Sequence, residues 1–504
     1  MANILKKVIP LNRVEGDMEI HIELDRDNVV VEARSVGTMY RGIENLMTGR
    51  GPLDGLVITP RICGICTTAH LNAAAKALDM AFSAAVPDNA RRLRNVTLMV
   101  EQMQNDLRHL FLLFMVDFTD MRYTQAPWYD QALRRYRVIK GTTALEIVKE
   151  TKKIIEVIAI LGGQWPHSSF MVPGGVVSVP SGNDIAQCRH IMRAFRRWYE
   201  RRILGCSLER WRAVQTSADL DGWLAEHASH QSSELGFFIQ LARSVGLDRM
   251  GRGHDCFISS GGVDMPNQTN VQGDGVGRQL FPSGIFTPSG LARFDPQKIS
   301  EEVAASFFKE EGNSRHPYDG RTVTDADSQD PGKYSWAKAP RYDGRPMETG
   351  PLADMLAAGD PLFTEEVQSR GSTVFLRELA RMVRATHLLP AVDQWLVEMT
   401  ECDTPFYQEY WKQVSARGHG FVPAPRGFLG HWLVIADGRI ANYQVITPTT
   451  WNGSPRDGNG VRGPWEEAIV GLRVDDPANP IEVGQVVRSF DPCLVCTVHA
   501  VRLE

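Results

Sequence analysis

Two Cys-x-x-Cys pairs near opposite ends of the chain constrain its fold more than any other feature. One pair is Cys63 and Cys66, and the other is Cys493 and Cys496. A Cys-x-x-Cys loop places two thiolates on one side of a tight turn, so each pair can chelate a metal. Together the pairs supply four soft sulfur ligands, which suit zinc, an iron–sulfur cluster or nickel.

The cysteine spacing alone leaves the metal open. A structural zinc site is the most common occupant of paired cysteines, and a redox-active pair comes next. Structural zinc modules are usually local in sequence, whereas these pairs are separated by most of the chain. A histidine also follows each pair, at His70 and His499, and indicates roles beyond simple chelation.

Composition excludes several classes of protein. The chain has 504 residues, of which 43% are hydrophobic, and its formal net charge is -5. This supplies enough apolar material for a large core, and no basic excess exists to neutralise nucleic-acid phosphates. The 8 cysteines are too sparse in a chain of this length for a disulfide scaffold.

The sequence shows neither a membrane-spanning segment nor a secretory signal. No apolar run is long enough to cross a membrane, and residues 1–10 lack the apolar region of a secretory signal. We therefore expect a cytoplasmic protein with no transmembrane segment. Association with the inner face of the membrane, or export as the passenger of a partner subunit, stays open.

Hydrophobic patterning predicts a mixed fold, mainly α with smaller β elements. Alternation over 17–36 predicts an N-terminal β-hairpin within about residues 8–36. Helical spacing predicts a core of long helices over about 70–400, followed by a C-terminal metal-binding segment over about 420–504. The predicted helices are 71–85, 88–116, 144–162, 184–205, 297–310 and 372–400, with an extended loop over 311–350 and strand over 430–446. No linker divides the chain, so we expect residues 1–504 to form a single large unit.

The residues around the cysteines match a known family. Residues 61–70 read Arg-Ile-Cys-Gly-Ile-Cys-Thr-Thr-Ala-His, and residues 491–499 read Asp-Pro-Cys-Leu-Val-Cys-Thr-Val-His. Both segments resemble the signatures of nickel-iron hydrogenase large subunits. Five further segments resemble the family, namely 12–16, 40–44, 334–351, 424–432 and 450–457. The resemblance covers nearly the whole chain and implies that family's fold, a long-helix bundle with peripheral sheets.

The resemblance implies a nickel-iron centre held by the four paired cysteines. By motif position, Cys63 and Cys493 would be terminal nickel ligands, while Cys66 and Cys496 would bridge nickel and iron. The iron would carry carbon monoxide and cyanide ligands. The implied reaction is reversible heterolytic cleavage of dihydrogen to protons and electrons, in the uptake direction, with the Cys493 thiolate as the first candidate base.

An arginine and two carboxylates would act beside the metals. Arg426 follows Pro425 in a Pro-Arg-Gly context and resembles the family's arginine above the open metal position, with Pro425 lining the same pocket. Asp117 and Asp491 resemble the carboxylates that pair with this arginine. Without the family context, such a cluster is more often a structural ion pair.

Other positions resemble the family's proton relay and magnesium site. Glu15 resembles the first relay carboxylate, because a carboxylate whose pKa is raised by burial can receive a proton. Glu44, His499 and the main-chain carbonyl of Val445 resemble the protein ligands of a buried magnesium. His70 would hydrogen-bond a bridging sulfur.

One further histidine resembles a family position, and two other positions depart from the family pattern. His167 would line the route toward the partner's nearest cluster. Asp17 and Phe114 stand where many members have histidine, which fits a divergent branch near cytoplasmic uptake or hydrogen-sensing enzymes. The presence of His70 favours an uptake enzyme. Residues 500–504 extend beyond His499, after which most members are cut once nickel is inserted.

The chain needs a partner to carry electrons. All four paired cysteines are used at the active site, so none remain to ligate an electron-transferring cluster. We therefore expect a separate iron–sulfur small subunit, in a heterodimer or a higher oligomer of heterodimers. The alternatives are a hydrogen-sensing regulatory subunit of the same family and a structural zinc protein. The related quinone-site subunit of respiratory complex I lacks the cysteines.

Overall fold

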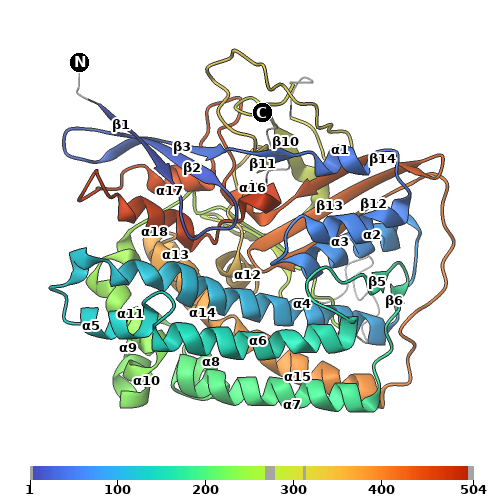
Figure 1. Cartoon of the computed structure of the whole chain (residues 1–504), viewed down its shortest axis with the longest axis horizontal. Coiled ribbons are helices and arrows are strands. Elements are labelled where there is room, and N and C mark those ends of the chain that lie inside the picture. Colours follow the sequence, from blue (N-terminus) through green and yellow to red (C-terminus); the bar gives the residue numbers. More distant parts are fainter. Residues whose placement is uncertain (1–3, 267–278, 310–313, 498–504) are drawn as a thin grey trace.

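Long helices form a bundle on one side of the molecule, and small sheets lie mainly on the other side (Figure 1). The computed structural model describes residues 4–266, 279–309 and 314–497. In the bundle, α4 (Asp88–Arg108) packs against α6 (Thr142–Gly162) and α15 (Ala385–Glu401). Both α6 and α15 also contact α7 (Gly182–Tyr199). The predicted mixed, mainly α fold with a long-helix bundle and peripheral sheets is confirmed.

The central helix of the bundle is α4, whose side chains are buried on nearly all sides. It continues without a break into a π-helical turn, η3 (His109–Phe114), and then a 3₁₀ turn, η4 (Met115–Thr119). A π-helical turn changes the direction of the side chains that follow it and often lies at a functional site. The predicted helix over 88–116 is therefore present, with its last turns wound differently.

The N-terminal sheet contains the predicted hairpin and one additional strand. β2 (Met18–Leu24) and β3 (Val30–Gly37) pair in antiparallel register, and β1 (Leu5–Pro10) adds to the free edge of β2. Ile20 and Ile22 point into the core, as their alternation with polar residues predicts.

A second three-stranded sheet lies directly against α3 (Thr67–Ala81), the helix that follows the first cysteine pair. Its strands are β12 (Ala416–Ala424), β13 (Gly427–Ala436) and β14 (Arg439–Ile446). Gly420 allows this close approach, because a Cβ there would lie 2.1 Å from the Ala73 carbonyl oxygen. The β12–β13 turn, which carries Arg426, is thereby held near the cysteines.

One predicted helix is wrong. Residues 297–310 contain the short turn η8 (Pro296–Lys298) and the strand β10 (Ile299–Glu302), which pairs with β11 (Ala339–Tyr342) inside the predicted loop 311–350. Local composition favours a helix here, but pairing with β11 places Glu301 beside the buried Lys338 ammonium, at 3.5 Å. Tertiary pairing therefore overrides the local preference.

The remaining elements are short and connect these layers. The helices are α1 (Ile43–Met47), α2 (Gly55–Ile58), α5 (Tyr129–Tyr136), α8 (Leu208–Arg212), α9 (Ser217–Glu226), α10 (Ala228–Ser232), α11 (Glu234–Ser244), α12 (Pro351–Ala357), α13 (Pro361–Arg370), α14 (Val374–Val383), α16 (Pro448–Asn452), α17 (Pro464–Ile469), α18 (Ile481–Ser489) and α19 (Leu494–Thr497). The strands are β4 (Tyr40–Arg41), β5 (Met171–Val172), β6 (Gly175–Val176), β7 (Phe257–Ser260), β8 (Ser283–Thr287) and β9 (Gly290–Ala292). Within the described part of the chain, no helix is both long and apolar enough to span a membrane.

Candidate metal centre

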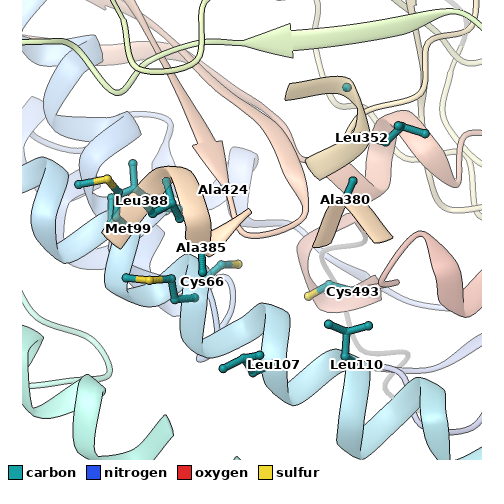
Figure 2. Packing of buried hydrophobic residues seen from close by; sticks show 14 of the residues in the cluster. Cys66, Met99, Leu107, Leu110, Leu352, Ala380, Ala385, Leu388, Ala424 and Cys493 are labelled. Carbon is teal, nitrogen blue, oxygen red and sulfur yellow. The ribbon is translucent and has the colours of Figure 1, made fainter. Parts of the chain in front are cut away.

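The fold brings the two cysteine motifs together in the buried core. Cys63 and Cys66 precede α3, and Cys493 precedes α19; all three side chains are buried. The Sγ atoms of Cys63 and Cys493 lie 3.5 Å apart. Figure 2 shows Cys66 and Cys493 in the same packed cluster, beside the helix that carries Leu107. Two thiolates about 2.3 Å from one metal ion lie roughly 3.3 to 3.8 Å apart, so this separation suits a shared metal.

The fourth cysteine completes the motif in sequence. Cys496 belongs to α19, but its side chain lies outside the described residues, as does all of His499. Without them, the described side chains do not by themselves form a group of three or more His, Cys, Asp and Glu donors around one point.

The N-terminal segment 12–16 holds the C-terminal cysteine motif in place. Glu15 forms a parallel β-bridge with Cys493, and the Leu494 amide donates to the Glu15 carbonyl at 2.7 Å. Gly16, at φ 82, packs directly on α19. Arg41 adds a second link, because its Nη2 donates to the carbonyls of both Ile62 and Val495. Arg41 therefore ties the two cysteine loops together, a role that the motif pattern did not predict.

Arg426 extends over the cysteines from the β12–β13 turn. Its Nε donates to Asp491 Oδ1 at 3.0 Å, while its buried Nη1 has no hydrogen-bond partner. Burial alone would lower the pKa of Arg426, but Asp491 and the Cys493, Cys63 and Cys66 sulfurs raise it well above its usual value. Two sulfurs 3.5 Å apart, with the Cys66 sulfur also near Arg426 and an unsatisfied guanidinium nitrogen beside them, fit a metal centre next to Arg426.

Asp491 is the carboxylate that pairs with Arg426. Burial would raise its pKa, but Arg426 and His109 outweigh that effect and hold the pKa well below its usual range. Its Oδ2 accepts from Asn105 Nδ2 at 2.7 Å. The charged pair is therefore fully inside the protein, next to Cys493.

Asp117 does not join this pair. Its carboxylate accepts from Arg488 Nη2 and Nε at 2.7 and 3.0 Å, and from Arg13. Asp106, in the last turn of α4, is linked to the site through Arg384. It accepts from Arg384, whose Nη2 also donates to the Pro425 carbonyl at 2.7 Å. The sequence did not indicate a role for Asp106, because Asp106 belongs to no motif and lies in a stretch whose spacing predicts only a buried helix.

Glu15 lies at the edge of the centre and is only partly buried. Burial and the neighbouring Cys63 raise its pKa, against the opposing effect of Arg426 and Arg41. Glu15 is thus partly exposed and close enough to Cys63 to feel its charge.

His70 is buried beside the centre in a chain of polar rings. Its Nδ1 lies 3.1 Å from His431 Nε2, and His431 Nδ1 lies 2.8 Å from the Tyr443 hydroxyl. Burial lowers the pKa of His70 to about 4, so its imidazole is neutral. His167 lies against the first cysteine motif. Its Nδ1 contacts the Pro60 carbonyl at 3.0 Å, and its amide donates to Thr67 Oγ1.

A separate polar hollow of about 20 Å³ surrounds Glu44. Glu44 Oε1 accepts from the Val445 amide at 2.9 Å, and Lys338 Nζ lies 3.2 Å from Oε2. Lys338 also donates to Gln444 Oε1 at 2.5 Å. The hollow has carboxylate and amide oxygens suited to a hard cation, but the contact described at Val445 is its N–H, and Lys338 already neutralises Glu44.

Comparison with known proteins places this site in one family. The family model "Nickel-dependent hydrogenase" matches residues 41–132 and 240–499. The periplasmic [NiFeSe] hydrogenase large subunit of Desulfomicrobium baculatum is 30% identical, over 98% of this chain and 95% of that protein. The uptake hydrogenase large subunit of Rhizobium leguminosarum bv. viciae is 28% identical, over 99% of this chain and 96% of that protein.

Solved structures agree with the sequence relatives. The reduced, active Ni-Fe-Se hydrogenase of Desulfomicrobium baculatum superposes with a TM-score of 0.83 at 29% identity, covering 98% of this chain and 100% of that one. The reduced Ni-Fe-Se hydrogenase of D. vulgaris Hildenborough gives a TM-score of 0.81 at 29% identity, covering 99% and 100%. Likeness over the full length, together with the buried Cys63–Cys493 pair next to Arg426, establishes that the chain is a large subunit of the nickel-dependent hydrogenase family.

Proposed function

We propose that this chain cleaves dihydrogen to protons and electrons, in the uptake direction, as the catalytic large subunit of a nickel-iron hydrogenase. The observation that carries the proposal is the 3.5 Å approach of the Cys63 and Cys493 sulfurs next to Arg426, whose buried Nη1 has no hydrogen-bond partner. A structural zinc site gives no reason to bury an arginine against its thiolates.

Each cysteine has an assigned place in the proposal. Cys63 and Cys493 would be terminal nickel ligands, and Cys66 and Cys496 would bridge nickel to an iron that carries carbon monoxide and cyanide. When bound, this centre would supply the redox chemistry that splits dihydrogen. Pro425 would line the pocket on the Arg426 side, and His70 would donate to a bridging sulfur.

The protein's own groups would orient dihydrogen and remove the proton. The Arg426 guanidinium, held at Nε by Asp491, would present its free Nη1 to the substrate position. Cys493 Sγ would receive the proton first. The Glu15 carboxylate, whose pKa is raised by burial, would then carry it outward. Asp117 would support the site indirectly, by linking Arg488 to Arg13 of the N-terminal segment.

We also propose magnesium near Glu44. The hollow beside Glu44 is about the size of one water molecule, and Glu44, Glu301 and Thr322 are among the residues that line it. His499 and the Val445 carbonyl would complete the protein ligands. Glu44→Gln should lower the magnesium content while leaving nickel in place, and equal magnesium in both proteins would remove Glu44 from the ligand set.

An iron–sulfur small subunit would accept the electrons, in a heterodimer or a higher oligomer of heterodimers. We propose a location in the cytoplasm or at the inner membrane face, although one relative is named periplasmic. Cell fractionation with an antibody to the chain tests this.

Metal analysis and dye reduction together test the main proposal. The purified heterodimer should contain nickel and iron at about one nickel per large subunit, and it should reduce a dye under dihydrogen. Its infrared spectrum should contain cyanide and carbon monoxide bands that shift under dihydrogen. Zinc as the sole metal would refute the proposal, and dye reduction by the isolated large subunit would refute the need for the partner.

A further inference from the structure

A fully buried histidine joins the Arg426–Asp491 pair to a second carboxylate. His109 is the first residue of η3, and it is 2% exposed. Its Nδ1 lies 3.1 Å from Asp491 Oδ1, an ion-pair contact without hydrogen-bond alignment, and its Nε2 forms a hydrogen bond of 3.0 Å with Glu378 Oε1 on α14. The imidazole therefore bridges two carboxylates inside the core.

Two acidic neighbours favour the charged form of the ring. Ionised carboxylate oxygens only accept hydrogen bonds, and only an imidazolium has an N–H on both nitrogens. Burial by itself would lower the pKa of His109, but Asp491 and Glu378 outweigh burial and raise it. Both the contacts and the electrostatics favour the protonated ring.

The surrounding charges lead to the same conclusion. Glu378 Oε2 also accepts from Arg381 Nη1 at 2.7 Å, and Arg384 pairs with Asp106 at 2.7 Å and faces Asp354 at 3.5 Å. The buried groups that face the ring or each other are three guanidiniums (Arg381, Arg384, Arg426) and four carboxylates (Asp106, Asp354, Glu378, Asp491). A protonated His109 adds a positive charge to this group of acids.

The position of Asp491 depends on this charge. Its Oδ1 is shared by Arg426 Nε and His109 Nδ1, and its Oδ2 is held by Asn105. A neutral His109 would present a lone pair to one of the two carboxylates and repel it. Asp491 would then turn, and the guanidinium of Arg426 would turn with it.

We propose that His109 is a positioning residue, held as an imidazolium by Glu378, which orients Asp491 and thereby aims Arg426 at the metal-binding cysteines. This inference rests on the proposed role of the Arg426–Asp491 pair. It places the control of Arg426 in the π-helical turn of η3 and in α14, neither of which carries a cysteine motif.

The activity arm uses the heterodimer and two variants. His109→Gln should keep its nickel and lower kcat by roughly ten- to a hundredfold, as expected for a residue that orients a group acting at a metal centre. Glu378→Gln removes the negative charge that keeps the ring protonated. The alkaline limb of its kcat profile should therefore move to lower pH by about one unit or more. His230→Gln is the matched control, because His230 is buried but stacks on Trp223 away from the centre. It should keep the wild-type profile.

The second arm does not depend on activity. Because the pKa of His109 is raised in the folded state, the stability it contributes is present below about pH 6.5 and is lost as pH rises through the folded pKa. The melting temperature of wild type relative to His109→Gln should fall over that range. Two results together would overturn the inference. One is a kcat profile of Glu378→Gln whose alkaline limb matches that of wild type, and the other is a melting-temperature difference between wild type and His109→Gln that does not change with pH. Absence of nickel or dihydrogen oxidation in the wild type would instead refute the proposed function and leave the melting arm as the test of His109.

Discussion

Gly16 offers a sharp test of how the N-terminal segment holds the C-terminal cysteines. Gly16 has φ 82, a left-handed conformation that costs an L-residue about 1 to 2 kcal/mol. A Cβ added there would lie 3.0 Å from both the amide nitrogen and Cγ1 of Val495. Because nonbonded carbon contacts prefer about 3.5 Å or more, α19 would have to move by roughly half an ångström. A displacement of that size is enough to disturb a metal site.

Gly49→Ala is the matched control for this substitution. Gly49 has φ 81, but nothing lies within 4 Å of an added Cβ, so it carries the backbone cost without the clash. Both variants should lose a similar small amount of thermal stability from backbone strain. Only Gly16→Ala should also lose nickel, to half or less of the wild-type content by elemental analysis. Full nickel in Gly16→Ala, or equal loss in Gly49→Ala, would refute the view that Gly16 positions Cys493 and Cys496.

Three further outcomes are expected. Glu15→Gln should slow turnover and leave nickel content unchanged, since an amide cannot receive the proton; full dihydrogen oxidation would exclude the relay role. Burial raises the pKa of Glu101 from 4.5 to about 7, so the stability that this carboxyl contributes is greatest below pH 4.5 and declines as pH rises through 7. The melting temperature of wild type relative to Glu101→Gln should decline across that range, and a constant difference would contradict this. Phe114 is 0% exposed, so Phe114→Ala should cost about 3 to 5 kcal/mol of unfolding free energy, and a loss well under 1 kcal/mol in chemical denaturation would show that the core closes around the site.

Regular periodicity predicted the elements that depend on local pattern. The hairpin over 17–36 and the helices near 88–116, 144–162 and 184–205 follow from alternating or helical spacing of apolar residues. The error over 297–310 has a different origin. A strand forms there because β11 supplies a partner from a distant segment, and no local pattern encodes that partner.

Some residues of the candidate site could be assigned from sequence motifs, and others only from the structure. Motif context assigned Arg426 and Asp491, and their side chains do meet, at 3.0 Å. It also assigned Asp117, whose carboxylate instead binds Arg488 and Arg13. Asp106 and His109 carry no motif, and their places beside the Pro425–Arg426 turn and Asp491 follow only from the direction of α4 and its π-helical turn.

The sequence by itself determined the family and the ligand chemistry, because soft sulfur donors in paired motifs and their flanking residues are local properties of the chain. Tertiary structure alone decided which charges meet. The two cysteine motifs lie at opposite ends of the sequence, yet segment 12–16 and Arg41 hold them together. A buried charge is stable only with a partner of opposite sign. The partners of Arg426, Asp491 and His109 come from separate elements, and packing of those elements in three dimensions selects them.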